Sequence, residues 1–190
     1  MIVISPEMDV PAALREAWTA LPRTRHPLVP AHSDLKLTAL RAVMPYILLF
    51  QHRGDGNVAA HMVGAHIKDI LGLDQDTPIT GDYHPVSFEG IAQQRHLVRR
   101  MLETPCGLNT TRRLRHDTAL AGHILLDMHI LPLADRNGDV TRGVAAMDFR
   151  DSAGNRHPWV PVDPRKLDPE LADHRFIDIG GGLPAERIDP

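Results

Sequence analysis

The chain has 190 residues, 43 % of them apolar, and a formal net charge of −3. This composition is typical of a globular protein and excludes wholesale disorder. Charges of both signs are interspersed, so the chain offers no field for nucleic acid or an anionic membrane surface.

The single cysteine, Cys106, excludes an internal disulfide and a cysteine-based zinc site. The first residues lack the basic and apolar regions of a signal peptide. The longest apolar runs, such as 46–50, are too short to span a membrane. We therefore expect a soluble protein of the cytoplasm.

A helix, a connector and a second short helix are expected before the first strand. Residues 9–20 repeat apolar positions at helical spacing, and Asp9 can cap this helix. The segment 21–32 contains three prolines, which favours an extended connector. Ser33 or Asp34 can cap the second helix, which must end by Pro45.

From Tyr46 onward the periodicity is that of a hairpin followed by a turn of helix. Residues 46–52 are rich in β-forming residues and lead into the turn signal RGDGN, so 58–63 is the expected second arm. Alternation puts Val58, Ala60 and Met62 on one face of that arm. Gly64 breaks the strand, and a short helix over 65–72 ends at Gly72.

A longer helix and three strands follow the polar, turn-rich segment 74–85. Ser87 can cap the helix at 87–104, which Pro105 ends. Strands are expected at 107–116, 122–134 and 141–151, the last two joined by the turn DRNGD. Alternation turns these side chains inward: Ile124, Leu126, Met128, Ile130, Ala145, Met147 and Phe149. Asp127 and His129 then lie on the outer face, unless the register slips by one residue.

The order of elements predicts an α+β fold. A five-stranded antiparallel sheet would carry helices on one face, with the N-terminal helix flanking it. We expect an N-terminal helix and connector at 1–45, a core domain at 46–150 and an extension at 151–190. The extension is rich in proline, glycine and acidic residues, so it is expected to lie on the surface or to order against a partner.

This order resembles that of a PAS sensor domain. The motifs MPYILLFQH, VGAHIKDILG, ETPCG and LPLADRNGDVTRGVAAM, in this order and spacing, resemble the small bacterial PAS family called PAS-5. The resemblance covers about residues 10–150. Where that family often has an arginine and an aromatic residue in the second strand, this chain has Ala59, Ala60 and His61, which would widen a cavity or reflect different packing.

The resemblance implies a regulatory or interaction module with a PAS fold. We expect a small organic ligand, or a protein partner, to bind between the inner face of the sheet and the helical segment 64–104, and any output to pass through association with another protein. Mostly apolar walls suit an organic ligand or none. The expected pocket-lining residues are Ile47, Leu49, Ala60, Met62, Val98, Met101, Leu126, Met128, Ala145 and Met147.

A homodimer is also expected, because PAS domains frequently dimerise through the N-terminal helix. The apolar side of this helix, with Leu14, Trp18 and Leu21, could pack on its own sheet or across a dimer axis. Asp127 and His129, on the outer face, would join such an interface. A buried Asp127 would need a partner such as His129, Arg112 or His61.

Twelve histidines raise the question of a metal or haem. His61 and His66 lie on different elements, with His66 expected toward solvent, and no paired zinc-ligand spacing is present. A haem-binding PAS domain would use a histidine such as His96 on the 87–104 helix, but a solvated side chain is the preferred interpretation. Cys106 lacks the asparagine-containing motif of a flavin-adduct photosensor. We therefore expect no metal and no cofactor.

Two alternatives to a sensor stay open. One is a small α+β enzyme with a cavity, in which Asp127 acts as a general base and must therefore face that cavity. The other is a scaffold with a fully packed core and no ligand. The chain has neither a GxSxG motif nor a phosphate-binding glycine loop, so an enzyme is the less favoured interpretation.

Overall fold

The computed structural model describes residues 8–53, 58–70, 91–114, 124–151, 154 and 167–185. Six strands form one antiparallel sheet in the order β2-β1-β5-β4-β3-β6. The strands are β1 (Ile47–His52), β2 (Val58–Val63), β3 (Gly107–Leu114), β4 (Ile124–Ala134), β5 (Val140–Arg150) and β6 (Leu167–Ile177). The helices are α1 (Val10–Thr19), α2 (Ala65–Ile70) and α3 (Ile91–Glu103), and two 3₁₀ turns are η1 (His32–Asp34) and η2 (Met44–Tyr46).

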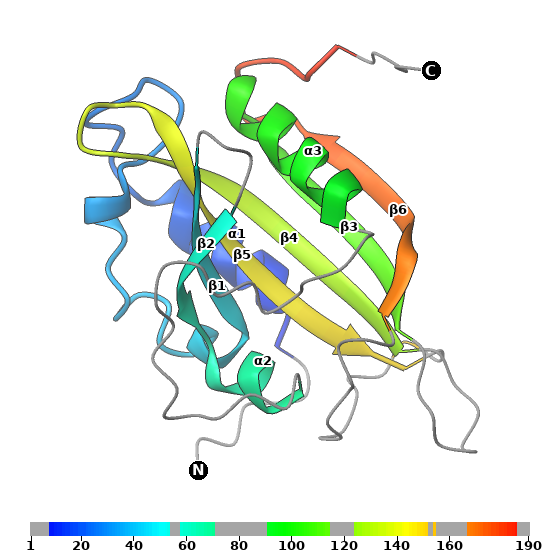
Figure 1. Cartoon of the computed structure of the whole chain (residues 1–190). Coiled ribbons are helices and arrows are strands. Elements are labelled where there is room, and N and C mark those ends of the chain that lie inside the picture. Colours follow the sequence, from blue (N-terminus) through cyan, green and yellow to red (C-terminus); the bar gives the residue numbers. More distant parts are fainter. Residues whose placement is uncertain are drawn as a thin grey trace, which may run out of the picture.

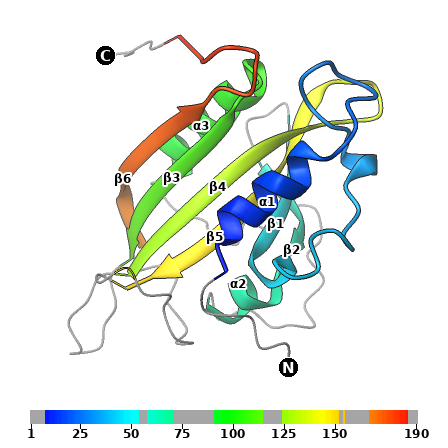
Figure 2. The same cartoon turned by 180° about the vertical axis from the view of Figure 1, so that it is seen from behind.

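The helices lie on both faces of the sheet. Figure 1 shows α2 and α3 in front of the strands, and the reverse view in Figure 2 shows α1 on the opposite side. We call the first side the α2/α3 face and the second the α1 face. The α+β prediction is confirmed, with one strand more than expected.

Helix α1 begins as the sequence predicts. The backbone N–H of Ala12 donates to the Asp9 side chain at 2.9 Å, which satisfies one of the free donors of the first turn. Leu14 and Trp18 are buried against the α1 face of the sheet. The indole Nε1 of Trp18 donates to the carbonyl oxygen of Pro132 on β4 at 2.8 Å, so α1 is fixed to the sheet by a polar contact as well as by packing.

The expected helix between residue 33 and Pro45 is wrong. Leu35 leaves helical conformation at ψ 95°, and the segment continues in turns with bonds between residues three apart, such as Val43 N–H to the Leu40 carbonyl at 2.9 Å. The core decides this outcome, because Leu35, Leu40, Val43 and Tyr46 are all buried under α1.

A β-bulge in the first hairpin changes which residues face which layer. Leu49 pairs with Met62 and Phe50 with Ala60, so His61 is the extra residue. A bulge residue inverts the alternation beyond it. Ala60 and Val63 therefore pack on the α2/α3 face, while Met62 packs on the α1 face.

The remaining elements follow the sequence closely. Strands β3, β4 and β5 match the expected segments within two residues at each end. The turn DRNGD closes as expected, with Asn137 N–H donating to the Asp135 carboxylate at 2.8 Å and Gly138 at φ 94°. Ser87 and Gly72, the expected ends of the two helices, lie outside the described residues.

The C-terminal extension supplies the sixth strand. β6 pairs antiparallel with β3 along its length, with His174 opposite Thr110 and Asp173 opposite Thr111. The extension therefore orders against the chain's own β3 over 167–177, while residues 172–175 are exposed, in line with the expected surface location. The boundaries at residues 45 and 150 stay a prediction. Within the described ranges, no helix is long and apolar enough to cross a membrane.

Candidate functional site

The α2/α3 face carries two hydrophobic clusters, one under each helix. The cluster under α2 contains Ala60, Val63, Ile67, Ile70, Ile124, Leu126, Met147 and Phe149. The cluster under α3 contains Phe50, Leu97, Val98, Met101, Leu102, Cys106, Leu108, Ile130 and Ala145. Leu48 on β1 and Met128 on β4 contact both clusters and are only half-buried. The centre of this face is therefore apolar but incompletely covered.

Most of the expected pocket residues lie on this face. They are Ala60, Val98, Met101, Leu126, Met128, Ala145 and Met147. Ile47, Leu49 and Met62 instead belong to the cluster under α1, so their assignment to the same face is wrong. In β1 it is Leu48 and Phe50 that face α2 and α3, and for Met62 the bulge at His61 is the cause.

Two buried polar groups adjoin the cluster under α3, and neither was predicted from the sequence. Arg112 and Thr110 on β3 are 3 % and 2 % exposed. Arg112 Nη2 donates to Gln94 Oε1 on α3 at 3.5 Å, and burial lowers the pKa of Arg112. Alternation with Leu108 is the signal that could have placed these two side chains inward.

On the α1 face, His129 is buried at 5 % exposure and hydrogen-bonds through Nδ1 to Asn109 Oδ1. Burial lowers the pKa of His129 to about 4; the charge of Arg15 acts in the same direction and that of Asp9 opposes it. The imidazole is therefore neutral near pH 7.

Asp127 lies on the same outer face, as alternation predicts. It accepts from Thr111 Oγ1 at 2.7 Å and lies 3.7 Å from Arg150 Nε. Arg150 also contacts the fully buried Asp148 at 2.7 Å. The partners expected for Asp127 were His129, Arg112 or His61, and its partners among the described residues are Thr111 and Arg150 instead.

The dimer-interface candidates are mostly occupied within the chain. Leu14 and Trp18 are 0 % and 4 % exposed against the chain's own sheet, and Leu21 packs on the same cluster. His129 is covered as well. Leu14, Trp18 and His129 are therefore buried within the chain, whereas Leu21 is half-buried and Asp127 keeps an exposure of 37 %.

The histidines and the cysteine that were considered as cofactor or metal ligands differ in burial: some are exposed and others are buried. His96 is exposed on α3, and Cys106 is buried beneath it, where burial raises the pKa of the thiol to about 11. His66 is half-buried rather than solvated, with its ring 4.5 Å from that of Tyr46. Among the described residues, no group of three histidine, cysteine, aspartate or glutamate side chains is placed to hold a metal ion.

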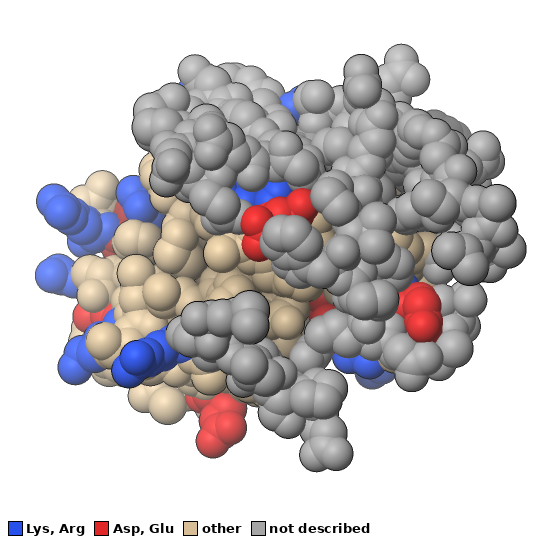
Figure 3. Space-filling view, turned by 90° about the horizontal axis from the view of Figure 1, so that it is seen from below, with Lys and Arg blue, Asp and Glu red and all other residues tan. Residues whose placement is uncertain are grey.

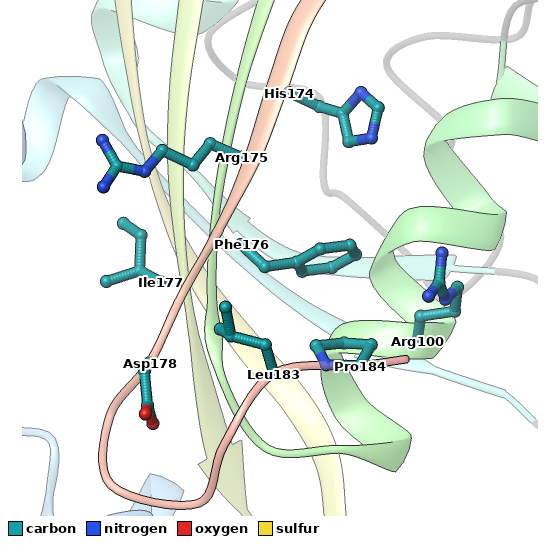
Figure 4. A pocket seen from close by; sticks show the side chains of 8 residues that line it. All are labelled: Arg100, His174, Arg175, Phe176, Ile177, Asp178, Leu183 and Pro184. Carbon is teal, nitrogen blue, oxygen red and sulfur yellow. The ribbon is translucent and has the colours of Figure 1, made fainter. Parts of the chain in front are cut away.

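A groove of about 480 Å³ lies beside the outer edge of β6, with which no other described strand pairs. Its walls are Arg100 of α3, residues 174–178, and Leu183 and Pro184 of the segment that follows β6. In Figure 4, His174 and Phe176 project to the α3 side of the strand, and Arg175 and Ile177 to the other side. Side chains from both faces of β6 line the groove, because the groove runs along the outer edge of this strand.

Charge is spread over the described surface. In Figure 3, basic and acidic side chains of the described part are scattered among uncharged ones on the face shown. This agrees with the interspersed charges of the sequence.

The sheet order, with β1 between β2 and β5, α2 and α3 over one face and α1 over the other, defines an α+β fold of the PAS type. A family model described as PAS domain, PAS_5, matches residues 8–147, which is well over half of the chain. The chain belongs to this PAS domain family, and membership indicates a sensory or regulatory module. No curated protein matches the chain. β6 lies beyond the matched residues.

Proposed function

We propose that this protein is a PAS-fold sensor of the cytoplasm that binds a small, largely apolar molecule between α2 and α3 and signals by associating with another protein. The observation that carries the proposal is the partial exposure of Leu48 and Met128 between the two clusters. A packed core would bury both side chains, since each is apolar and central on the sheet. A ligand seated there would complete the burial and join the two clusters.

The position of Asp127 does not favour the enzyme alternative. That hypothesis requires a carboxylate that faces a cavity on the α2/α3 face. Asp127 lies on the opposite face, where Thr111 and Arg150 hold it. A ligand-free scaffold is the interpretation that remains if no molecule binds.

Native mass spectrometry of the full chain, purified without denaturation, tests the proposal. We expect a stoichiometric bound molecule, and we expect Met128→Trp to lower its occupancy at least about tenfold by filling its space. Leu125→Trp is the matched control, because Leu125 lies on the same strand as Met128, is also half-buried and faces away from α2 and α3. Equal loss in both variants, or undiminished binding in Met128→Trp, would place the ligand elsewhere. The purified chain could instead carry no bound molecule, and no compound in a panel of apolar ligands could raise its melting temperature. That result would reject the ligand sensor and support the ligand-free scaffold.

A further inference from the structure

The outer edge of β6, with which no other described strand pairs, carries two side chains of opposite charge. Asp173 and Arg175 are both exposed and lie two residues apart, so they share one face of the strand. Their neighbours on β3 are Thr111 and Asn109, which carry no charge. Neither side chain has an ion pair or hydrogen bond within the part of the chain that the structure describes.

The spacing of these charges is self-complementary. If a second copy of β6 pairs antiparallel with the first, with the two-fold axis at His174, residues whose numbers are symmetric about 174 lie opposite each other. Asp173 then faces the partner's Arg175, and Arg175 faces the partner's Asp173. Opposite charges in directly opposed cross-strand positions stabilise the pairing.

The surroundings of the edge suit an added strand. The unpaired N–H and C=O groups of an edge strand are ready donors and acceptors for another strand. The groove of about 480 Å³ runs beside residues 174–178 and leaves room on that side. Leu183, which is 53 % exposed, lines the same groove and would be covered by a neighbouring strand.

We propose that β6 is a homodimer interface, at which two copies of the chain join their sheets edge to edge about an axis at His174. A bulge at Ala172 interrupts the regular pairing of β6, so the ladder between the two copies is short. Such an interface buries less than about 1,200 Å² in total, which is typical of a reversible association. The interface lies outside the matched PAS residues and is independent of the ligand site proposed above.

Charge reversal tests the pairing in the full chain. Asp173→Arg and Arg175→Asp each place like charges opposite one another twice about the axis. We expect each variant to weaken the dimer at least about tenfold in sedimentation velocity over a concentration series. The double variant Asp173→Arg/Arg175→Asp should recover the wild-type association, because each pair is again of opposite sign.

Mixing the two single variants gives a sharper test. In a heterodimer, one copy carries two arginines and the other two aspartates, so both cross-strand pairs attract. The equimolar mixture should therefore dimerise although each variant alone does not. Arg99→Glu is the matched control, since it reverses an exposed charge that pairs with Glu103 on α3 at 3.6 Å, and it should leave the association unchanged.

A crosslink supplies an independent readout. Residues directly opposed in an antiparallel pair have Cα atoms about 4.5–5.5 Å apart, within the range that a disulfide spans. His174→Cys should therefore form a disulfide-linked dimer on mild oxidation, while Asn137→Cys, in the exposed β4–β5 turn, should not. A wild-type chain that stays monomeric at all concentrations would overturn the proposal. So would single charge variants that dimerise like the wild type, or a His174→Cys chain that links no faster than the control.

Discussion

Gly64 lies directly against the backbone of Pro45. A Cβ atom at residue 64 would be 2.3 Å from the Pro45 carbonyl oxygen, a distance that real Cβ atoms do not adopt. The backbone N–H of Gly64 also donates to the Ile47 carbonyl at 2.8 Å, which joins the start of α2 to the start of β1. Glycine is required here for close approach rather than for an unusual dihedral angle.

Gly64→Ala should therefore destabilise the chain. Backbone atoms must move to admit the methyl group, because the obstruction is a carbonyl rather than a flexible side chain. We expect a loss of about 2–4 kcal/mol in the free energy of unfolding, measured by urea titration. Ala65→Ser, at the exposed neighbouring position, should change it by less than about 0.5 kcal/mol. Equal effects of the two substitutions would contradict the role given to Gly64.

Trp18→Phe tests how α1 is held to the sheet. The substitution keeps an aromatic ring but removes the donor to the buried Pro132 carbonyl. We expect a loss of about 2–3 kcal/mol from the unpaired carbonyl and the smaller ring. Arg23→Met removes the guanidinium 4.6 Å above the Trp18 ring and its hydrogen bond to the Thr19 carbonyl at 2.9 Å, but keeps the bond between Trp18 and Pro132. Because the Thr19 carbonyl is exposed and can bind water instead, this variant should cost less than about 1 kcal/mol. If Arg23→Met instead destabilised the chain more than Trp18→Phe, the hydrogen bond would not be the contact that fixes α1.

His129 should make stability depend on pH. Its folded-state pKa is lowered to about 4, whereas an unfolded histidine titrates near about 6.5. Between these values the unfolded chain binds a proton that the folded chain does not, so stability falls as the pH falls through this window. The expected contribution is at most about 3 kcal/mol between pH 6.5 and 4. His129→Asn, which keeps a donor toward Asn109, should flatten the stability profile, while His96→Asn should follow the wild type.

Cys106 should be unreactive in the folded chain. Burial raises the pKa of its thiol to about 11 from 9.0, with Asp178 adding to the effect and Arg100 opposing it. The thiolate fraction at pH 8 is then about 100-fold below that of a free cysteine. Labelling by iodoacetamide should be slow in native buffer and complete in urea. Rapid native labelling would mean that α3 opens readily from β3.

The sequence predicted the strands well where one face is polar and the other apolar. The inward set of β4 and β5 follows from alternation alone, and the outward place of Asp127 follows with it. The bulge at His61 escaped prediction, because a single extra residue leaves no compositional mark, and it moved Met62 to the other layer. Leu35, Leu40 and Val43 escaped for a different reason, since tertiary burial overrode the local preference for a helix.

β6 was missed because its early part contains Pro169 and several acidic residues, which are unfavourable in strands. Its alternation is visible only over a few residues near Phe176, too few to distinguish from a loop. The burial of Arg112 was missed although the residue alternates with Leu108, because a charged residue in a strand is ordinarily exposed. The interior position of β3 was missed for another reason. A single strand does not reveal whether another strand will cover its outer edge, and β6 is what turns β3 into an interior strand.

The pairing of β6 with β3 has a consequence for the order in which the sheet folds. During synthesis β3 precedes β4 and β5. Its other neighbour in the sheet, β6, is synthesised only after both of them. Until residues 167–177 emerge and return across the sheet, β3 keeps an open edge with the buried-type side chains Thr110 and Arg112 next to it. Contacts of such long sequence separation form slowly and leave intermediates open to wrong strand pairing. We expect the arrival of β6 to be the step that commits a growing chain to its native sheet.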